Sequence, residues 1–310
     1  MARDASKHRI LIAGECGQVG EALKLTLAPL GEIYAPTLEV LDLTDTLSTR
    51  KAMREFRPRW VVNAAAHTAV DKAESEPELV FALNATAPEV LAEEAKKIGA
   101  AMVHYSTDYV FDGTKQTPYV ESDATGPLNV YGQSKLAGEM AVSASGVAHL
   151  TFRTSWVYGA TGNNFLRSIL RLARERDHLR VVGDQHGAPT WSFDLARLTA
   201  HAIAQIEGSA AQNKCSLEEA ALAVSGLYHA SSVGETTWYG FAMQAIAELQ
   251  QMEPEAKLAT VEAISTAEYP TAAKRPLNSL LDCSKLAEVF DWRMMDWRQS
   301  LSLVLGELAR

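Results

Sequence analysis

Tyr131 and Lys135 are the two residues of this chain whose spacing most clearly suits acid–base chemistry. A separation of four residues places both side chains on one face of a helix. The lysine charge favours the phenolate and lowers the pKa of the tyrosine from its reference of about 10, which makes the phenol a proton donor near neutral pH. The same spacing arises when a tyrosine caps a core face and its lysine is exposed, so the pair needs support from a second motif.

Ser106, Thr107 and Asp108 supply that support, because they stand where an apolar stretch beginning at Met102 ends. Ligands of open α/β sheets bind at the carboxyl ends of the strands. A hydroxyl at this place can form a hydrogen bond to a substrate oxygen while Tyr131 exchanges a proton with the same atom. The two segments together therefore predict an active site for a small molecule.

Gly14, Gly17 and Gly20 follow the apolar stretch Ile10–Ala13 directly and open a helix. Glycines at such a junction let the backbone turn tightly and approach a pyrophosphate, while the helix N-terminus offers free N–H groups. The spacing is GxxGxxG and departs from the usual GxGxxG fingerprint, and Glu15 is an awkward neighbour for phosphates. A tight turn without a ligand is the alternative, but the place of the motif favours nucleotide binding.

An alternation of short apolar stretches with stretches of helical periodicity must position these motifs. It predicts βαβ units and a Rossmann-type, doubly wound parallel sheet in an α/β fold. Pro88 lies inside one helical stretch and predicts a kink or a break there. The expected strands are Ile10–Ala13, Trp60–Ala66, Met102–Ser106 and His149–Val157, and the expected helices are Val19–Ala28, Asp45–Phe56, Leu79–Ile98 and Ser134–Ser143.

The second half of the chain has shorter, interleaved elements, which predict a smaller C-terminal substrate-binding lobe. We expect residues 1–160 to form the dinucleotide-binding domain, with later segments returning to it, and residues 161–310 to form mainly the lobe. Glu207–Ser225 begins with small and polar residues and is expected to be a surface excursion. Further helices are expected at 165–176, 194–206 and 239–249 and in a C-terminal pair, with strands at 179–182 and in the GLYHAS segment.

Composition excludes several classes of protein. The formal net charge of -9 over 310 residues argues against nucleic-acid binding, which needs a basic face. No apolar run reaches the ~18–20 residues of a membrane span. The three cysteines are far apart without a CxxC pair, which indicates neither disulfides nor a zinc site and suits a reducing compartment. The polar lead MARDASKH lacks a signal-peptide core, so a cytoplasmic protein is expected.

Longer blocks of sequence resemble a known family. VNAAAHTAVDKAE, HYSTDYVFDG, YGQSKLAGE and RTSWVYG occur in the order and spacing of the extended short-chain dehydrogenase/reductases. More narrowly, GNNF, DQHGAPT and EYPTAAKRPLNSLLDCSKL resemble the dTDP-4-dehydrorhamnose reductase family almost from end to end. Glu207–Ser225 is the part least similar to the family. The resemblance implies NAD(P)H-dependent reduction of the C4 keto group of dTDP-4-dehydro-L-rhamnose, in dTDP-rhamnose synthesis for lipopolysaccharide O-antigen.

The resemblance also implies a catalytic trio. Tyr131 would donate a proton to the C4 oxygen, Thr107 would bind and polarise that oxygen, and Lys135 would hold the nicotinamide ribose and tune Tyr131. The cofactor residues that it implies are Gly14, Gly17, Gln18, Val19, Asp42, Leu43, Ala66, His67, Thr68, Tyr105 and Lys135. The substrate residues are Thr107, Asp108, Tyr131, Trp156, Asn164 and Arg275, of which Arg275 is the best remaining cation for the diphosphate.

Some of these residues also have a simpler interpretation, in which their role is purely structural. Trp156 could be core packing, Arg275 a surface salt bridge and His67 a satisfied core histidine. The expected second strand, GEIYAPT, ends with neither an acidic residue nor an arginine, and Glu39 lies a few residues further on, so the choice between NADH and NADPH stays open. Some members of the family have a magnesium-linked dimer interface. No matching carboxylate cluster is seen in this sequence, so we expect no metal. Binding of Mg²⁺ and formation of a homodimer stay open as alternatives.

Two other functions remain alternatives. One is a reductase or epimerase of another nucleotide-linked sugar, since epimerases use the same tyrosine and lysine. The other is a non-catalytic, cofactor-binding regulatory subunit, for which a complete Tyr131–Lys135 pair would be unnecessary. For a dianionic dTDP-sugar in an acidic protein we expect a local positive pocket near Lys135 and Arg275.

Overall fold

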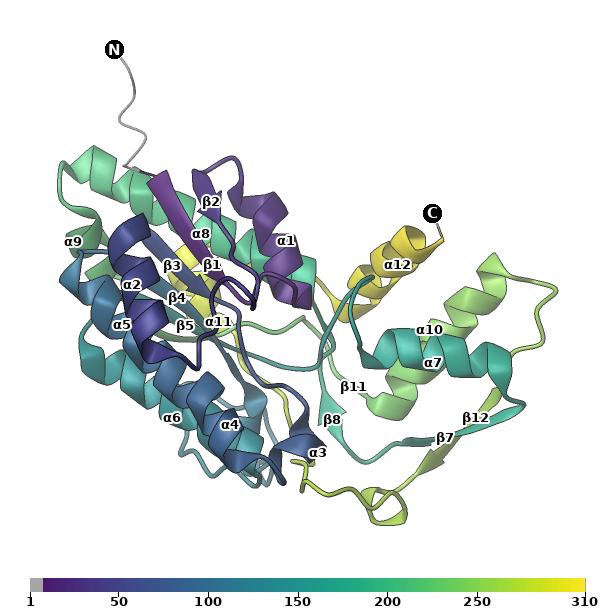
Figure 1. Ribbon diagram of the computed structural model, residues 1–310. Coiled ribbons are helices and arrows are strands. Elements are labelled where there is room, and N and C mark those ends of the chain that lie inside the picture. The colour runs from purple at the N-terminus through teal and green to yellow at the C-terminus, as the bar shows by residue number, and fades with distance from the viewer. Residues whose placement is uncertain (1–7, 310) are drawn as a thin grey trace.

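A six-stranded parallel sheet forms the centre of the computed structural model, which describes residues 8–309 (Figure 1). The polar lead before His8 lies outside the described residues. Adjacent strands pair in parallel in the order β10-β5-β4-β3-β1-β2, which confirms the predicted Rossmann-type sheet. The strands are β1 (Arg9–Ala13), β2 (Glu32–Tyr34), β3 (Trp60–Asn63), β4 (Ala101–Thr107), β5 (His149–Thr154) and β10 (Gly226–His229).

Alternate residues of the strands are buried on opposite faces of the sheet. In β1, Ile10 and Ile12 belong to one core cluster, whereas Leu11 and Ala13 belong to the other. Helices cover both faces because every strand side chain of this kind must be removed from water. The first face carries α1 (Gln18–Leu27), α8 (Ser192–Asn213), α9 (Leu217–Leu222) and α11 (Ser284–Phe290); the second carries α2 (Thr46–Phe56), α5 (Ala87–Lys97) and α6 (Val130–Ser145).

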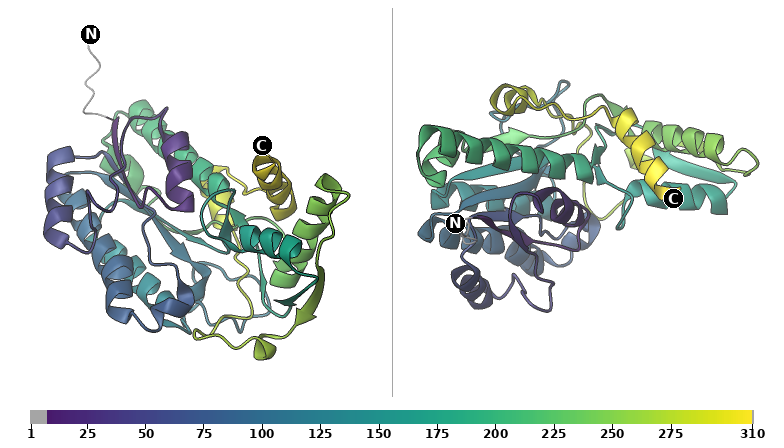
Figure 2. Two further views of the ribbon diagram at one scale, coloured as in Figure 1. Left: turned by 45° about the vertical axis from the view of Figure 1, so that its right-hand side comes forward. Right: turned by 90° about the horizontal axis from the view of Figure 1, so that it is seen from above.

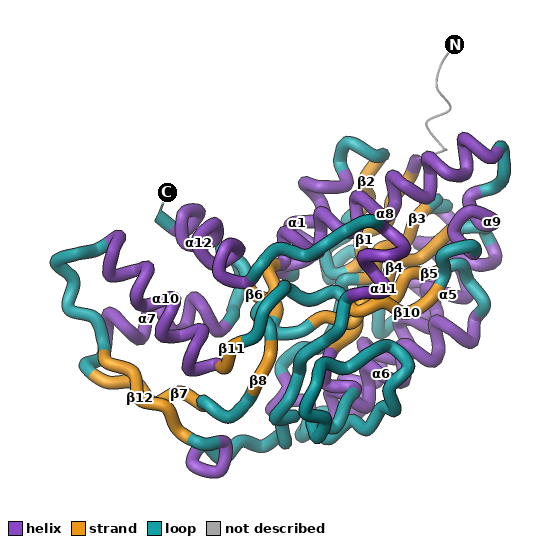
Figure 3. Tube along the Cα trace, turned by 180° about the vertical axis from the view of Figure 1, so that it is seen from behind, coloured by secondary structure: helices purple, strands orange, loops and turns teal. Residues whose placement is uncertain are grey.

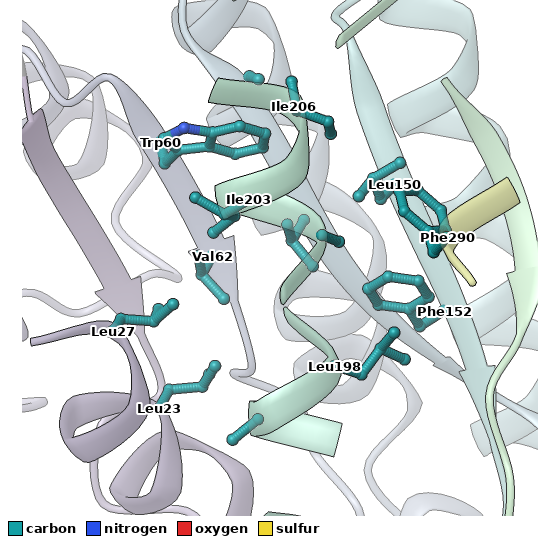
Figure 4. Packing of buried hydrophobic residues seen from close by; sticks show 14 of the residues in the cluster. Leu23, Leu27, Trp60, Val62, Leu150, Phe152, Leu198, Ile203, Ile206 and Phe290 are labelled. Carbon is teal, nitrogen blue, oxygen red and sulfur yellow. The ribbon is translucent and has the colours of Figure 1, made fainter. Parts of the chain in front are cut away.

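The core on the first face contains side chains from distant parts of the sequence (Figure 4). Leu198 and Ile203 of α8 lie between Val62 of β3 and Phe152 of β5, all of them buried. The second half of the chain therefore contributes to the same core as the first. The strand β10 does the same at one edge of the sheet, where it pairs with β5.

The helical stretch that contains Pro88 is interrupted, as expected. A short α4 (Pro77–Phe81) passes into a π-helical turn at Ala82–Thr86 and then into α5. Pro88 occupies the first turn of α5, where its missing N–H costs the helix least. The π-helical turn accommodates the change in helical hydrogen bonding that the proline imposes, and it places the Asn84 side chain in the interior.

The expectation of a surface excursion at Glu207–Ser225 is wrong. The helix α8 continues to Asn213, and α9 follows after a capping box at Ser216. Glu207 accepts hydrogen bonds from the guanidinium of Arg59 and the indole of Trp60 at 2.7–2.9 Å. The small residues include alanines, which favour helix, so their low hydrophobicity does not signal a loop.

A smaller lobe lies beside the carboxyl ends of the strands (Figures 1 and 2). The parallel pair β7 and β12 forms one edge of the lobe, and Figure 3 shows this pair below the helices α7 and α10. Tyr158, Phe241 and Trp297 are buried in the lobe's own core. The elements are α7 (Phe165–Glu175), α10 (Trp238–Met252), α12 (Trp297–Leu308), β6 (Val157–Tyr158), β7 (His178–Val182), β8 (His186–Gly187), β9 (Thr190–Trp191), β11 (Thr236–Thr237) and β12 (Thr260–Ile264).

None of the helices between His8 and Ala309 combines the length and the apolar character that crossing a membrane requires.

Candidate active site

A cavity of about 370 Å³ lies where the carboxyl ends of β3, β4 and β5 meet the glycine loop and the lobe. Its position is the one at which open α/β sheets bind ligands. It brings together most of the residues implied by the family resemblance. These are Gly17, Gln18, Val19, Ala66, Thr68, Tyr105, Thr107, Asp108, Tyr131, Lys135 and Trp156.

The glycine loop has the backbone geometry that a phosphate-binding turn requires. Gly14 has a φ of +83°, and a Cβ atom there would lie 2.5 Å from the Ala65 nitrogen, so only glycine is accommodated. The helix α1 starts after Gly17 without a hydrogen bond from a capping side chain. Glu15 is balanced by Lys24, whose Nζ lies 2.6 Å from the carboxylate. The loop can thus present N–H groups to an anion.

Thr107 and its neighbours form the floor of the cavity. The Thr107 hydroxyl donates to Asp108 Oδ1 at 2.9 Å and accepts from the Tyr109 N–H at 3.2 Å. The Tyr109 ring meets the Tyr131 ring edge-on, with centroids 5.7 Å apart. These contacts fix the orientation of the Thr107 hydroxyl and of the Tyr131 ring before any ligand is bound.

The ionisable groups of the site are shifted mainly by burial. Burial raises the pKa of Tyr131 to about 12, against a hydrogen bond with Thr107 that lowers it. Burial lowers the pKa of Lys135 to about 8, although the Glu139 charge raises it. The pKa of Asp108 rises to about 6 because its carboxylate is withdrawn from water.

The prediction that Lys135 lowers the pKa of Tyr131 is therefore wrong for this arrangement. The Lys135 ammonium donates to the Tyr105 carbonyl oxygen at 2.6 Å, on the strand rather than on its own helix. Desolvation of the phenol is then the largest influence on the pKa of Tyr131. Spacing on a helix predicts that two side chains share a face, but it does not predict which partner the ammonium chooses.

Asn84 is a residue of the site that sequence reasoning missed. Its amide accepts from the His67 N–H at 2.8 Å and donates to the His67 carbonyl at 3.1 Å and to Ser134 Oγ at 3.0 Å. It thereby ties the loop after β3 to the helix that carries Tyr131 and Lys135. A lone amide in an apolar helical stretch just before Pro88 was the signal that could have identified it.

Six of the implied residues do not line this cavity, and the sixth of them, Arg275, lines a second hollow that is described next. Gly14 packs against the backbone of Ala65, and Leu43 is buried in the core of the second face. Asp42 is exposed and accepts from the backbone and hydroxyl of Thr44. Asn164 caps α7 and donates to Gln18 Oε1 at 2.9 Å. The fifth, His67, lies 3.6 Å from Glu76 and is held through its backbone by Asn84.

Arg275 lines a second hollow, a groove of about 750 Å³ along the lobe. Its guanidinium forms an ion pair of 2.6 Å with Asp71, so the positive charge expected for a diphosphate is partly neutralised. The groove is lined by apolar side chains and by three arginines, and Trp238 lines both it and the cavity. Arg180, like Arg275, is paired with an acid, since its guanidinium lies 3.0 Å from Glu268. The apolar residues include Ile169, Leu172, Leu179, Val181 and Ile264, and the polar ones include Arg176, His178, Arg180 and Arg275.

Between His8 and Ala309, no cluster of three or more His, Cys, Asp or Glu side chains is arranged to hold a metal ion.

Comparison with known proteins gives a consistent result over almost the whole chain. Residues 8–310 match the family described as RmlD substrate binding domain. The chain is 46% identical over 303 residues to a protein of Escherichia coli named dTDP-4-dehydrorhamnose reductase, covering 96% of this chain and 97% of that protein. A Burkholderia thailandensis protein of the same name is 44% identical over 302 residues, covering 97% and 99%.

A crystal structure of Bacillus anthracis dTDP-4-dehydrorhamnose reductase in complex with NADP superposes with a TM-score of 0.85. Its sequence is 34% identical, and the match covers 97% of this chain and 99% of that one.

Proposed function

This chain belongs to the RmlD family, and on that premise we propose that it is an NAD(P)H-dependent dTDP-4-dehydrorhamnose reductase. It reduces the C4 keto group of dTDP-4-dehydro-L-rhamnose to the hydroxyl of dTDP-L-rhamnose. The observation that carries the proposal is the single cavity in which Thr107, Tyr131 and Lys135 face the glycine loop. Family membership alone would not require these three groups to converge.

The residues of the glycine loop fit a dinucleotide. Gly17 leaves room for a close backbone approach, the positive φ of Gly14 makes the turn before it, and the start of α1 has no capping side chain. Ala64, Ala65 and Ala66 form a small-residue wall on the other side of the cavity. The bound nicotinamide supplies the hydride that is added to C4. The NADP bound in the Bacillus anthracis structure, which is 34% identical, supports a nicotinamide cofactor, and the choice between NADH and NADPH is left to the test below.

Residues of this chain supply the proton to the C4 oxygen and stabilise the negative charge that develops on that oxygen. Tyr131 donates its phenolic proton to the C4 oxygen as that carbon is reduced, which leaves a phenolate. The Thr107 hydroxyl, which donates its one proton to Asp108 in this structure, turns that proton to the keto oxygen when the substrate binds and so polarises the carbonyl. The Lys135 ammonium, which donates to the Tyr105 carbonyl in this structure, holds the ribose hydroxyls of the cofactor.

The nucleotide part of the substrate belongs in the groove along the lobe. Its apolar side chains suit a base and a deoxyribose, and its arginines suit a diphosphate. The deoxysugar then extends past Trp156 toward Tyr131. In this assignment residues 1–160 mainly bind the cofactor and residues 161–310 mainly bind the substrate, apart from α8, α9, β10 and α11, which belong to the sheet domain.

The cellular setting is a further part of the proposal. We place the enzyme in the cytoplasm because Cys16, Cys215 and Cys283 are all free, as in a reducing compartment. A homodimer is the assembly we propose to test first, by light scattering.

The test is a fall in absorbance at 340 nm when purified protein meets NADH or NADPH and dTDP-4-dehydrorhamnose generated in situ. Steady oxidation supports the proposal, and the faster cofactor identifies the preference. A flat trace from folded protein with proven substrate would overturn it. Tightly retained cofactor would then indicate an epimerase, and a stoichiometric partner in a pulldown would indicate a binding subunit.

A further inference from the structure

Two indoles stack at the junction of the cavity and the groove. The Trp156 and Trp238 ring centroids lie 3.7 Å apart with an interplanar angle of 12°. Trp156 comes from the connection between β5 and β6, at the end of the central sheet, whereas Trp238 is the first residue of α10 in the lobe. The pair therefore joins the two parts of the molecule at the point where an extended substrate must pass.

The backbone of Trp156 is in an unfavourable conformation. Its φ is +47°, a region that bulky residues rarely occupy and that persists only where the surroundings enforce it. The carbonyl of Trp156 accepts from the Thr190 N–H at 3.2 Å, and the adjacent Ser155 hydroxyl donates to the Ala188 carbonyl at 2.9 Å. These contacts hold the backbone but do not fix the indole.

The Trp156 indole is clamped between two surfaces. On one side is Gly187, where a Cβ atom would come within 2.6 Å of the ring. On the other side is the Trp238 ring. A larger residue at position 187 would displace the Trp156 indole by steric clash. A smaller residue at position 238 would leave the opposite face of the indole without a packing partner.

Trp238 is itself held by a polar chain within the lobe. Its Nε1 donates to Gln185 Oε1 at 3.2 Å, and the Gln185 amide donates to Thr266 Oγ1 at 3.1 Å. The Thr266 hydroxyl donates to Asp184 at 2.6 Å, and Gln185 is buried. The Phe165 ring packs on Trp238 with centroids 4.6 Å apart. These contacts together hold the Trp238 side chain in one orientation.

We propose that Trp238 is a positioning residue that holds the Trp156 indole over the sugar site, with Gln185 fixing Trp238 in turn. The inference rests on the proposed function and deepens it. Because Trp238 lines both hollows, its ring also joins the sugar site to the nucleotide groove. Its effect on the reaction passes through Trp156.

The test is a double-mutant cycle on kcat and KM for the ketosugar, with Trp156→Leu, Trp238→Leu and the double variant. We expect each single variant to lower kcat/KM by about tenfold or more, and the double variant to lose little beyond Trp156→Leu. Trp238→Phe, which keeps a ring for stacking, should recover much of the loss. Additive losses, or a Trp238→Leu variant with wild-type kcat/KM, would overturn the proposal.

Two further measurements separate positioning from general damage. Because Trp238 also lines the groove, binding of dTDP alone, which lacks the sugar, should weaken in Trp238→Leu, but by a much smaller factor than kcat/KM falls. If dTDP binding falls as much as kcat/KM, Trp238 only shapes the groove and the proposal fails. Trp292→Phe is the matched control, since Trp292 packs beside His201 away from both hollows and should keep wild-type kinetics.

Wild-type turnover distinguishes the two levels of inference. An active wild-type enzyme with additive losses overturns the positioning role alone. A wild-type enzyme that leaves the ketosugar unreduced overturns the proposed function and this role together.

Discussion

Tyr131 is the group on which the proposed proton transfer depends. Tyr131→Phe removes the phenolic proton while keeping the ring that contacts Tyr109. We expect kcat to fall by about 10²–10⁴-fold, the usual contribution of a positioned acid. The dissociation constant of NADPH, measured by fluorescence titration, should stay within about twofold of wild type. Near-normal turnover would assign the proton to another group or to water.

Lys135 determines the alkaline limit of the activity. Its pKa of about 8 means that the ammonium is present below that pH and is lost above it, whereas Tyr131, with a pKa of about 12, keeps its proton. The value of kcat/KM should therefore fall about tenfold per pH unit above pH 8. A pH profile from 6 to 10 checks this. Lys135→Arg should move the limit upward, and a profile level to pH 9.5 would contradict the assignment.

Asp108 illustrates a conflict between stability and function. Its pKa of about 6 in the folded protein exceeds the ordinary value near 3.8, so the buried charge destabilises the fold above pH 6, and this cost disappears as the pH falls below 4. Asp108→Asn should raise the free energy of unfolding at pH 7 by about 2 kcal/mol, with no gain at pH 4. Its kcat should fall because Thr107 loses a charged acceptor. Urea unfolding at both pH values provides the measurement, and equal effects at both would contradict it.

At the scale of elements, the π-helical turn at Ala82–Thr86 has a structural consequence for the site. It buries Asn84, whose amide forms three hydrogen bonds that join the loop after β3 to α6. Asn84→Ala leaves those buried partners unsatisfied, so we expect a loss of about 2 kcal/mol in unfolding free energy and weaker cofactor binding. Thermal unfolding and NADPH titration check both. Asn213→Ala, an exposed amide at the end of α8, is the control and should change neither.

The strands and helices of the first half could be predicted because each follows from local pattern. Buried parallel strands appear as unbroken apolar runs, and the glycine loop and Thr107 are adjacent in sequence to strand ends. The helices at Glu207–Ser225 were missed because small and polar residues are common in loops as well, although the alanines and the Ser216 capping box favour helix locally. The contact of Glu207 with Arg59, 148 residues away, could not be read from the local pattern. Trp238 acts through partners on other elements, so composition and spacing gave it no distinguishing mark, and the mark of Asn84 was limited to a lone amide in an apolar helical stretch.

At the scale of the whole molecule, an ion pair is among the contacts that join the cofactor side to the substrate side. Asp71 follows β3 of the central sheet, and Arg275 belongs to the C-terminal part of the chain 204 residues later, with 2.6 Å between carboxylate and guanidinium. In a protein with a net charge of -9, a diphosphate needs local cations, and Arg275 is already shared with a carboxylate. Binding of a sugar nucleotide must therefore compete with Asp71 for the guanidinium.

This competition predicts opposite effects for the two partners. Arg275→Ala should weaken the binding of dTDP by about tenfold, and the loss should shrink at higher salt because exposed charges are screened. Asp71→Asn should tighten dTDP binding several-fold, since the guanidinium is released while the side chain keeps its size. Calorimetric titration at 50 and 300 mM salt would measure both. Weaker binding in both variants would instead mean that the ion pair is a structural clamp, whose closure the groove requires before the nucleotide can bind.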